Sequence, residues 1–189
     1  MYLLAIHGSP RKKGNTEIFL DAFISGLDSS FFVEKVRLAD LRFAPCLGCN
    51  KCEITGKCIL EDDFSILAEK ILRADIIVVS TPVYFYNHTS LVQAFYERFQ
   101  VFWVRKNILK MPHPFNKTPL GILLAIGATR GNKLFDSLKR SFRYVLDSIY
   151  GIYGGGLFLR GIEKKGEILK FPQYLEEARE LARYLKSIL

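Results

Sequence analysis

Four cysteines lie close together between residues 46 and 58, and the rest of the chain contains none. Their spacing is C-x2-C-x2-C-x5-C, which places four thiols within 13 residues. Disulfides that stabilise a small secreted fold are scattered along the chain, whereas a cluster of this kind is typical of a metal or redox centre. The spacing therefore predicts that Cys46, Cys49, Cys52 and Cys58 are metal ligands.

The two consecutive C-x2-C steps suit a [4Fe–4S] cluster, because neighbouring cysteines of such a cluster bind adjacent irons. Gly48 and Gly56 allow tight turns, which would let backbone N–H groups reach the cluster sulfurs. Zinc sites more often combine two C-x2-C pairs from separate segments. We favour the [4Fe–4S] cluster, and zinc and free or catalytic thiols stay open as alternatives.

A second group of chemically useful residues follows an apolar segment at residues 2–7 and reads GSPRKKGNT over residues 8–16. The start of a helix offers backbone N–H groups and a favourable dipole to an anion, and three cations add to this. The segment matches neither the Walker A loop nor the G-x-G-x-x-G dinucleotide fingerprint. It predicts binding of a terminal phosphate monoester; an ordinary strand-to-helix turn is the alternative. The predicted contacts are Ser9, Arg11, Gly14, Asn15 and Thr16.

Two further loops follow apolar segments and could contact a flat aromatic ligand. Residues 81–88 read TPVYFYNH, in which the proline fixes the backbone and three aromatic rings follow. The alternative is that these rings fill the core or a subunit interface. Residues 127–132 read GATRGN and give a weaker signal through Arg130 and Gly131. The predicted contacts in the first loop are Pro82, Val83, Tyr84, Phe85 and Tyr86.

The elements that must position these loops alternate along the chain. Residues 75–80 (DIIVVS) are typical of a central parallel strand, and further strands are predicted at residues 2–7, 31–38, 120–127 and 152–160. Apolar residues at helical spacing lie between them, including one continuous helical face over residues 91–103. Asn15 or Thr16 is expected to cap the first helix, and Asp62 the helix after the cysteines.

This alternation predicts an α/β fold with a flavodoxin-like, doubly wound, five-stranded parallel sheet of order 2-1-3-4-5. The cysteines form an insertion after the second strand, at residues 40–60, within a single flavodoxin-like domain spanning residues 1–189. Ligands of such sheets bind beyond the carboxyl ends of the strands, next to strand 1. The three polar and aromatic loops are therefore expected to meet at one edge of the sheet.

The length and composition of the sequence exclude several classes of protein. The chain has 189 residues, of which 49% are hydrophobic and 24% charged, so it can bury a core without disulfides. It has neither an apolar run of about 20 residues nor the charge order of a secretory signal, so we expect a cytoplasmic protein that does not enter a membrane. The net charge of +8 is spread along the sequence, which does not favour nucleic-acid binding.

Taken together, these motifs resemble the iron–sulfur flavoprotein family, within the NADPH-dependent FMN reductase group of flavodoxin-like folds. GSPRKKGNTE is similar to the group's FMN-phosphate loop, and TPVYFY is similar to its isoalloxazine loop. CLGCNKCEITGKC followed by EDD is similar to the family's compact cysteine insertion, and GEILKFPQYLEEARELARYL resembles its C-terminal segment. GATRGN departs from the more glycine-rich third loop of the group.

The resemblance implies FMN and one [4Fe–4S] cluster per chain, a homodimer or tetramer, and electrons supplied by ferredoxin or a similar donor. It also implies that the cluster approaches the flavin of a neighbouring subunit. In the electron transfer that we expect, no side chain need act as a nucleophile. The basic net charge would suit an acidic donor. The alternatives are an NAD(P)H-dependent FMN or quinone reductase without a working cluster, since related reductases keep similar cysteines, and a zinc-stabilised binding domain.

Overall fold

The computed structural model describes residues 1–188, so that of the expected domain only residue 189 lies outside the described part. Its centre is a sheet of five parallel strands in the order β2-β1-β3-β4-β5. This confirms the predicted flavodoxin-like order 2-1-3-4-5. The strands are β1 (Tyr2–His7), β2 (Phe32–Arg37), β3 (Ile76–Pro82), β4 (Leu120–Gly127) and β5 (Ile152–Arg160).

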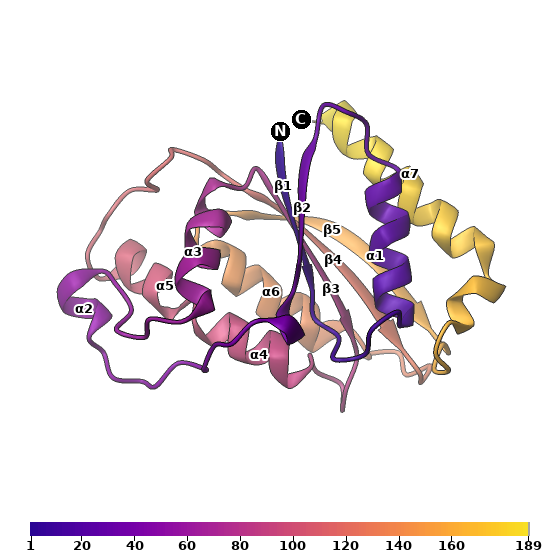
Figure 1. Ribbon diagram of the computed structural model, residues 1–189, viewed down its shortest axis with the longest axis horizontal. Coiled ribbons are helices and arrows are strands. Elements are labelled where there is room, and N and C mark those ends of the chain that lie inside the picture. Colours follow the sequence, from indigo (N-terminus) through magenta and orange to yellow (C-terminus); the bar gives the residue numbers. More distant parts are fainter. Residues whose placement is uncertain (189) are drawn as a thin grey trace.

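Helices cover both faces of the sheet (Figure 1). In β3, Ile77 and Val79 pack with one helical layer, whereas Ile76 and Val78 pack with the other. Burial on both faces explains why this strand is a continuous apolar run and not an alternating one. One layer is α1 (Asn15–Ser25) and α7 (Pro172–Ile188); the other is α3 (Asp63–Arg73), α4 (Ser90–Glu97), α5 (Gln100–Asn107) and α6 (Asp136–Ser148).

The loop after β1 is held tightly against the loop after β3. The Gly8 N–H donates to the Ser80 carbonyl at 2.8 Å, and the buried Thr89 hydroxyl donates to the Gly8 carbonyl at 2.6 Å. A Cβ atom on Gly8 would lie 2.1 Å from the Val92 side chain, so only glycine fits where the chain passes over α4. These contacts bring the two loops to one edge of the sheet, as predicted.

Helix boundaries differ from the sequence prediction in two places. The N-cap of α1 is Gly14, without a side-chain cap, so the expected capping by Asn15 or Thr16 is wrong. The helix expected over residues 91–103 is interrupted, because the Phe99 N–H bonds to the Tyr96 carbonyl three residues back and tightens the chain between α4 and α5. This turn places Arg98 at the end of α4, facing the cysteine segment.

The cysteine segment lies between β2 and α3 and is mostly irregular. Besides a short 3-10 turn at Leu38–Asp40, it contains the four-residue helix α2 (Cys52–Thr55), which the sequence did not predict. Asp62 then caps α3 by accepting a bond from the Phe64 N–H, as expected. Over residues 1–188, no helix has the length and apolar character needed to cross a membrane.

Candidate functional site

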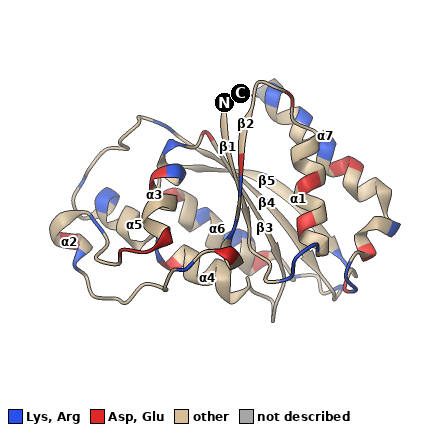
Figure 2. Cartoon of the chain, viewed as in Figure 1, with Lys and Arg blue, Asp and Glu red and all other residues tan. Residues whose placement is uncertain are grey.

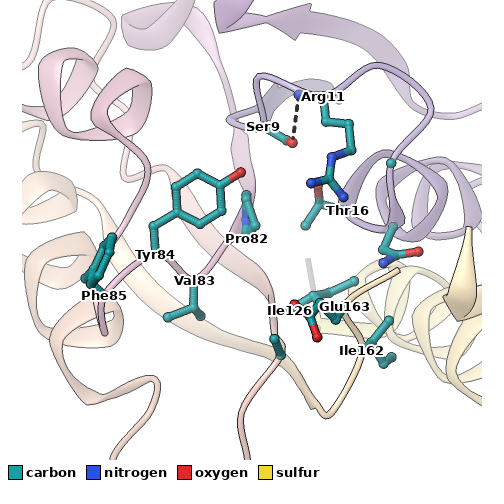
Figure 3. A pocket seen from close by; sticks show the side chains of 13 residues that line it. Ser9, Arg11, Thr16, Pro82, Val83, Tyr84, Phe85, Ile126, Ile162 and Glu163 are labelled. Carbon is teal, nitrogen blue, oxygen red and sulfur yellow. Dashed lines mark hydrogen bonds between the residues drawn. The ribbon is translucent and has the colours of Figure 1, made fainter. Parts of the chain in front are cut away.

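A cavity of about 310 Å³ opens at the carboxyl edge of the sheet, between the loops that follow β1 and β3. Figure 3 shows the loop after β1 on one side of it and the aromatic loop on the other. The structure therefore brings together most of the residues that the sequence predicted for phosphate and ring binding. Those that line the cavity are Ser9, Arg11, Gly14, Asn15, Thr16, Pro82, Val83, Tyr84 and Phe85.

The side of the cavity where the sequence predicts phosphate binding is built by a turn that leads into α1. The Arg11 N–H donates to the Ser9 hydroxyl at 3.1 Å, and the Arg37 side chain of β2 donates to the Pro10 carbonyl at 2.6 Å. The first backbone bonds of α1 run from the Glu17 and Ile18 N–H groups to the Gly14 carbonyl at 3.1 Å, so the N–H groups before them have no partner in the helix. These N–H groups and the Arg11 guanidinium, which extends along this side of the cavity in Figure 3, are donors that suit an anion.

His7 lies beneath this side of the cavity and is fully buried. Its Nε2 is 3.5 Å from the Thr16 hydroxyl. Burial lowers the pKa of His7 to about 4, so the ring is neutral at pH 7. His7 therefore adds no positive charge to this side of the cavity, and its ring contacts the Thr16 hydroxyl from the buried side.

Asn15 has a role that the sequence did not indicate. Its side-chain amide donates to the Lys164 carbonyl at 2.9 Å, and its side-chain oxygen accepts from the Ile168 N–H at 3.3 Å. The side chain thus ties the first turn of α1 to the segment after β5. Direct contact between Asn15 and a phosphate stays a prediction.

That segment also supplies part of the cavity wall through Ile162 and Glu163. No motif in the sequence marks these residues, because they reach the site only when β5 pairs with β4. Ile126 and Ala128, at the end of β4, complete the lining. Ala128 lies within the GATRGN loop and Ile126 directly before it, and this is the signal by which they could have been found.

The aromatic side of the cavity rests on a strained two-residue turn. Tyr84 and Asn87 exchange two backbone hydrogen bonds of 2.9 Å, and the intervening Phe85 and Tyr86 have φ angles of +50° and +60°. Glycine or asparagine normally occupies such positions, so two aromatic residues here indicate strain retained at a functional loop. The Val83 N–H bonds to the Ile126 carbonyl at 2.8 Å and fixes the loop on β4. Phe85 is fully exposed at the tip of this turn.

Three of the predicted ring contacts lie outside the cavity lining. Tyr86 lies over Gly131, where an added Cβ would be 2.1 Å from the Tyr86 hydroxyl. Arg130 lies with its guanidinium against Gly161. Tyr86, Arg130 and Gly131 therefore support the loops beside the cavity, and their contact with a ligand stays a prediction.

All four cysteines line one hollow of about 30 Å³, and all are free thiols. Burial is the largest effect on Cys52 and raises the pKa of its thiol. Within residues 1–188, no group of three or more His, Cys, Asp or Glu side chains is placed to hold a single metal ion. The thiols thus share a hollow but do not converge on one point.

Two donors point at the cysteine sulfurs. The Gly48 N–H lies 3.4 Å from Cys46 Sγ, and Arg98 Nη2 lies 3.5 Å from Cys58 Sγ. Arg98 also lines the hollow, and its side chain is only 1% exposed. Sequence reasoning missed Arg98, because it lies 40 residues from Cys58 within what looked like a helix interior.

Comparisons with known proteins agree with this arrangement. The family model described as NADPH-dependent FMN reductase matches residues 1–150. An iron–sulfur flavoprotein of Archaeoglobus fulgidus is 36% identical over 99 residues, which are 52% of this chain and 45% of that protein. An iron–sulfur flavoprotein of Methanosarcina thermophila is 31% identical over 131 residues, or 69% of this chain and 65% of that protein.

The chain thus spans between about half and two thirds of these curated relatives. Among solved structures, the NAD(P)H:quinone oxidoreductase from Methanothermobacter marburgensis superposes with a TM-score of 0.72, covering 98% of this chain and 97% of that one. Its sequence identity is 17%, so the likeness concerns the fold. The chain therefore belongs to the NADPH-dependent FMN reductase family of flavin-dependent oxidoreductases, and within it the chain is similar to the iron–sulfur flavoproteins.

Proposed function

We propose that this chain carries electrons between a one-electron donor, a [4Fe–4S] cluster held by Cys46, Cys49, Cys52 and Cys58, and FMN held in the cavity at the sheet edge. One observation carries the proposal: a single chain contains both a cavity with an anion side and an aromatic side, and a hollow lined by four free thiols. FMN has a terminal phosphate and a flat ring, which match the two sides of the cavity.

The residues present fit FMN in detail. The start of α1 and Arg11 would hold the phosphate, and the backbone of residues 82–85 would lie against the ring. A cavity of about 310 Å³ lies at the lower end of the range for cofactor sites. Pro82 has no N–H group, so the donors nearest the ring come from the residues after it.

The cysteine spacing fits an iron–sulfur cluster better than a zinc ion. Four thiolate ligands of zinc contact one ion and must converge, whereas each cysteine of a [4Fe–4S] cluster binds its own iron. Here all four cysteines lie in one 13-residue segment and line one hollow, whereas zinc sites more often combine two C-x2-C pairs from separate segments. The two hydrogen bonds to Cys46 and Cys58 are of the kind that adjusts cluster potentials.

When bound, the cluster would supply one-electron transfer and FMN both one- and two-electron chemistry. The protein's own residues bind and orient these groups and need not act as acid, base or nucleophile. Helix α4 begins directly after the aromatic loop and ends at Arg98 beside the cysteines. Its eight residues span about 12 Å, so the two sites are neighbours in the fold but share no lining residue.

We further propose that an acidic one-electron donor such as ferredoxin reduces the protein. The net charge of +8 supports this, since a positive field speeds encounter with an acidic partner. Lys and Arg residues are distributed over both helical layers (Figure 2). Homodimers or tetramers in the cytoplasm, with the cluster of one chain near the flavin of another, complete the proposal.

An NAD(P)H-dependent FMN or quinone reductase without a working cluster is the second candidate. Two observations favour this candidate. Within the described part of the chain, no group of three or more His, Cys, Asp or Glu side chains is placed to hold a metal ion. The solved NAD(P)H:quinone oxidoreductase has the same fold.

Chemical analysis of anaerobically purified and reconstituted protein separates the candidates. We expect about four iron and four sulfide per FMN. Yellow protein that stays free of iron after reconstitution would favour the reductase. Colourless protein with bound zinc and no flavin would contradict both.

A further inference from the structure

Arg98 is a buried cation. It belongs to none of the three sequence motifs, namely the phosphate loop, the aromatic loop and the cysteine motif, so these motifs do not explain its burial. Its side chain is 1% exposed, and it is among the largest fully buried side chains of residues 1–188. Burying a guanidinium is costly unless it is paired and hydrogen-bonded. The groups that contact the Arg98 side chain therefore indicate its role.

One side of the guanidinium is fixed by partners that have no redox chemistry. Nη1 donates to Asp62 Oδ2 at 2.6 Å and to the Ala44 carbonyl at 2.9 Å, and the group lies 4.6 Å from the centre of the Phe64 ring. Burial opposes ionisation of Asp62, but the bonds from Arg98 and from the Ala44 N–H outweigh it and hold the pKa of this carboxyl below its usual range. Asp62 is therefore charged and fixes the orientation of Arg98.

The other side of the guanidinium faces the cysteine hollow. Nη2 lies 3.5 Å from Cys58 Sγ and 3.5 Å from the Leu60 carbonyl. Arg98 lines the hollow together with all four cysteines. A cation and an N–H donor beside a ligand sulfur stabilise the more negative, reduced form of a cluster more than the oxidised form.

We propose that Arg98 is a positioning residue that raises the reduction potential of the cluster by donating a hydrogen bond to Cys58. The inference rests on the proposed function, in which the cysteines hold a [4Fe–4S] cluster. The step involved is the addition of one electron from the donor to the cluster, with no bond made or broken. Asp62 holds Arg98 in place and partly offsets its charge at the same time.

The test is a redox titration of the cluster, followed by electron paramagnetic resonance, in the reconstituted holoprotein. We expect Arg98→Met to lower the equilibrium constant for cluster reduction by about tenfold, which is a shift of about 59 mV for one electron. Arg98→Lys keeps the charge but loses the forked donor geometry, so we expect a smaller shift in the same direction. Because Lys can still pair with Asp62, this variant decides the matter if Arg98→Met does not fold.

Arg105→Gln is the matched control. Arg105 donates to the Gly56 carbonyl at 2.5 Å, so it contacts the same cysteine segment without a hydrogen bond to a sulfur. Its removal should shift the potential much less than removal of Arg98.

Equal shifts in the Arg98 and Arg105 variants, or an unchanged potential in Arg98→Lys and Arg98→Met, would overturn the inference while leaving the proposed function intact. Loss of iron from Arg98→Lys would also overturn it, because Arg98 would then only hold the segment together. Wild-type protein that takes up no iron would overturn the proposed function and the inference with it.

Discussion

Replacement of Arg11 by Met tests whether the cavity at the sheet edge recognises a phosphate. Arg11 lines the cavity, and no described acidic side chain pairs with it. Met keeps much of the length and apolar stem of the side chain while removing its charge and donors. The substitution should therefore weaken binding of FMN through its phosphate and leave the ring contacts in place.

The size of the effect follows from the exposure of Arg11. A hydrogen bond to a charged group contributes about 1.5–3 kcal/mol. Arg11 is exposed, so its contribution is screened by water and belongs at the lower end of that range. A loss of about 1.4 kcal/mol corresponds to about a tenfold increase in the Kd of FMN at low salt.

Titration of the flavin-free protein with FMN, followed by quenching of flavin fluorescence, measures this change. Riboflavin is the matched ligand, because it has the same ring and no phosphate, and its Kd should hardly change. Lys12→Met is the matched variant, because Lys12 is exposed, lies 3.8 Å from Asp40 and does not line the cavity. Equal weakening of FMN and riboflavin by Arg11→Met would refute the assignment of this loop to the phosphate.

Three further predictions concern the cluster, the buried histidines and the donor. Cys52→Ser should remove the broad cluster shoulder from the absorption spectrum of reconstituted protein while the flavin bands stay; survival of the shoulder would exclude Cys52 as a ligand. His88, in the loop after β3, is buried like His7, and its Nε2 lies 2.6 Å from the Ser141 hydroxyl. Burial lowers the pKa of each histidine to about 4, against 6.5 in the unfolded chain, so only the unfolded state gains protons between these values. The free energy of unfolding should therefore fall as the pH drops from about 6.5 to 4, by up to about 3 kcal/mol per histidine. Urea denaturation of the flavin-free protein should show a smaller fall in His88→Gln, and an identical fall would contradict this. The rate of reduction by ferredoxin should decrease steeply with added salt in stopped-flow measurements, and a flat response would argue against charge steering.

The sheet could be predicted because local sequence and tertiary environment agree there. The run of β-branched residues in β3 is buried on both faces, so the pattern and the packing give the same answer. Four thiols in a short segment were likewise predictable as one group, because few residues separate them. Asp62 has both the residue type and the position of an N-cap.

Features that depend on distant contacts could not be read from the sequence. The apolar spacing from Leu91 to Trp103 continues through the turn between α4 and α5, so periodicity gave no sign that Arg98 leaves the helix there. Glu163 reaches the cavity only through the pairing of β5 with β4. Asn15 has the residue type of a phosphate donor, but its amide bonds to a segment about 150 residues away.

The central claim is that one chain holds two redox centres, and the number of electrons it accepts tests this most directly. Anaerobic titration of the reconstituted protein with dithionite, followed by absorption, should consume about three electrons per chain, two for FMN and one for the cluster. Consumption of only two, with spectral changes confined to the flavin bands, would contradict the account.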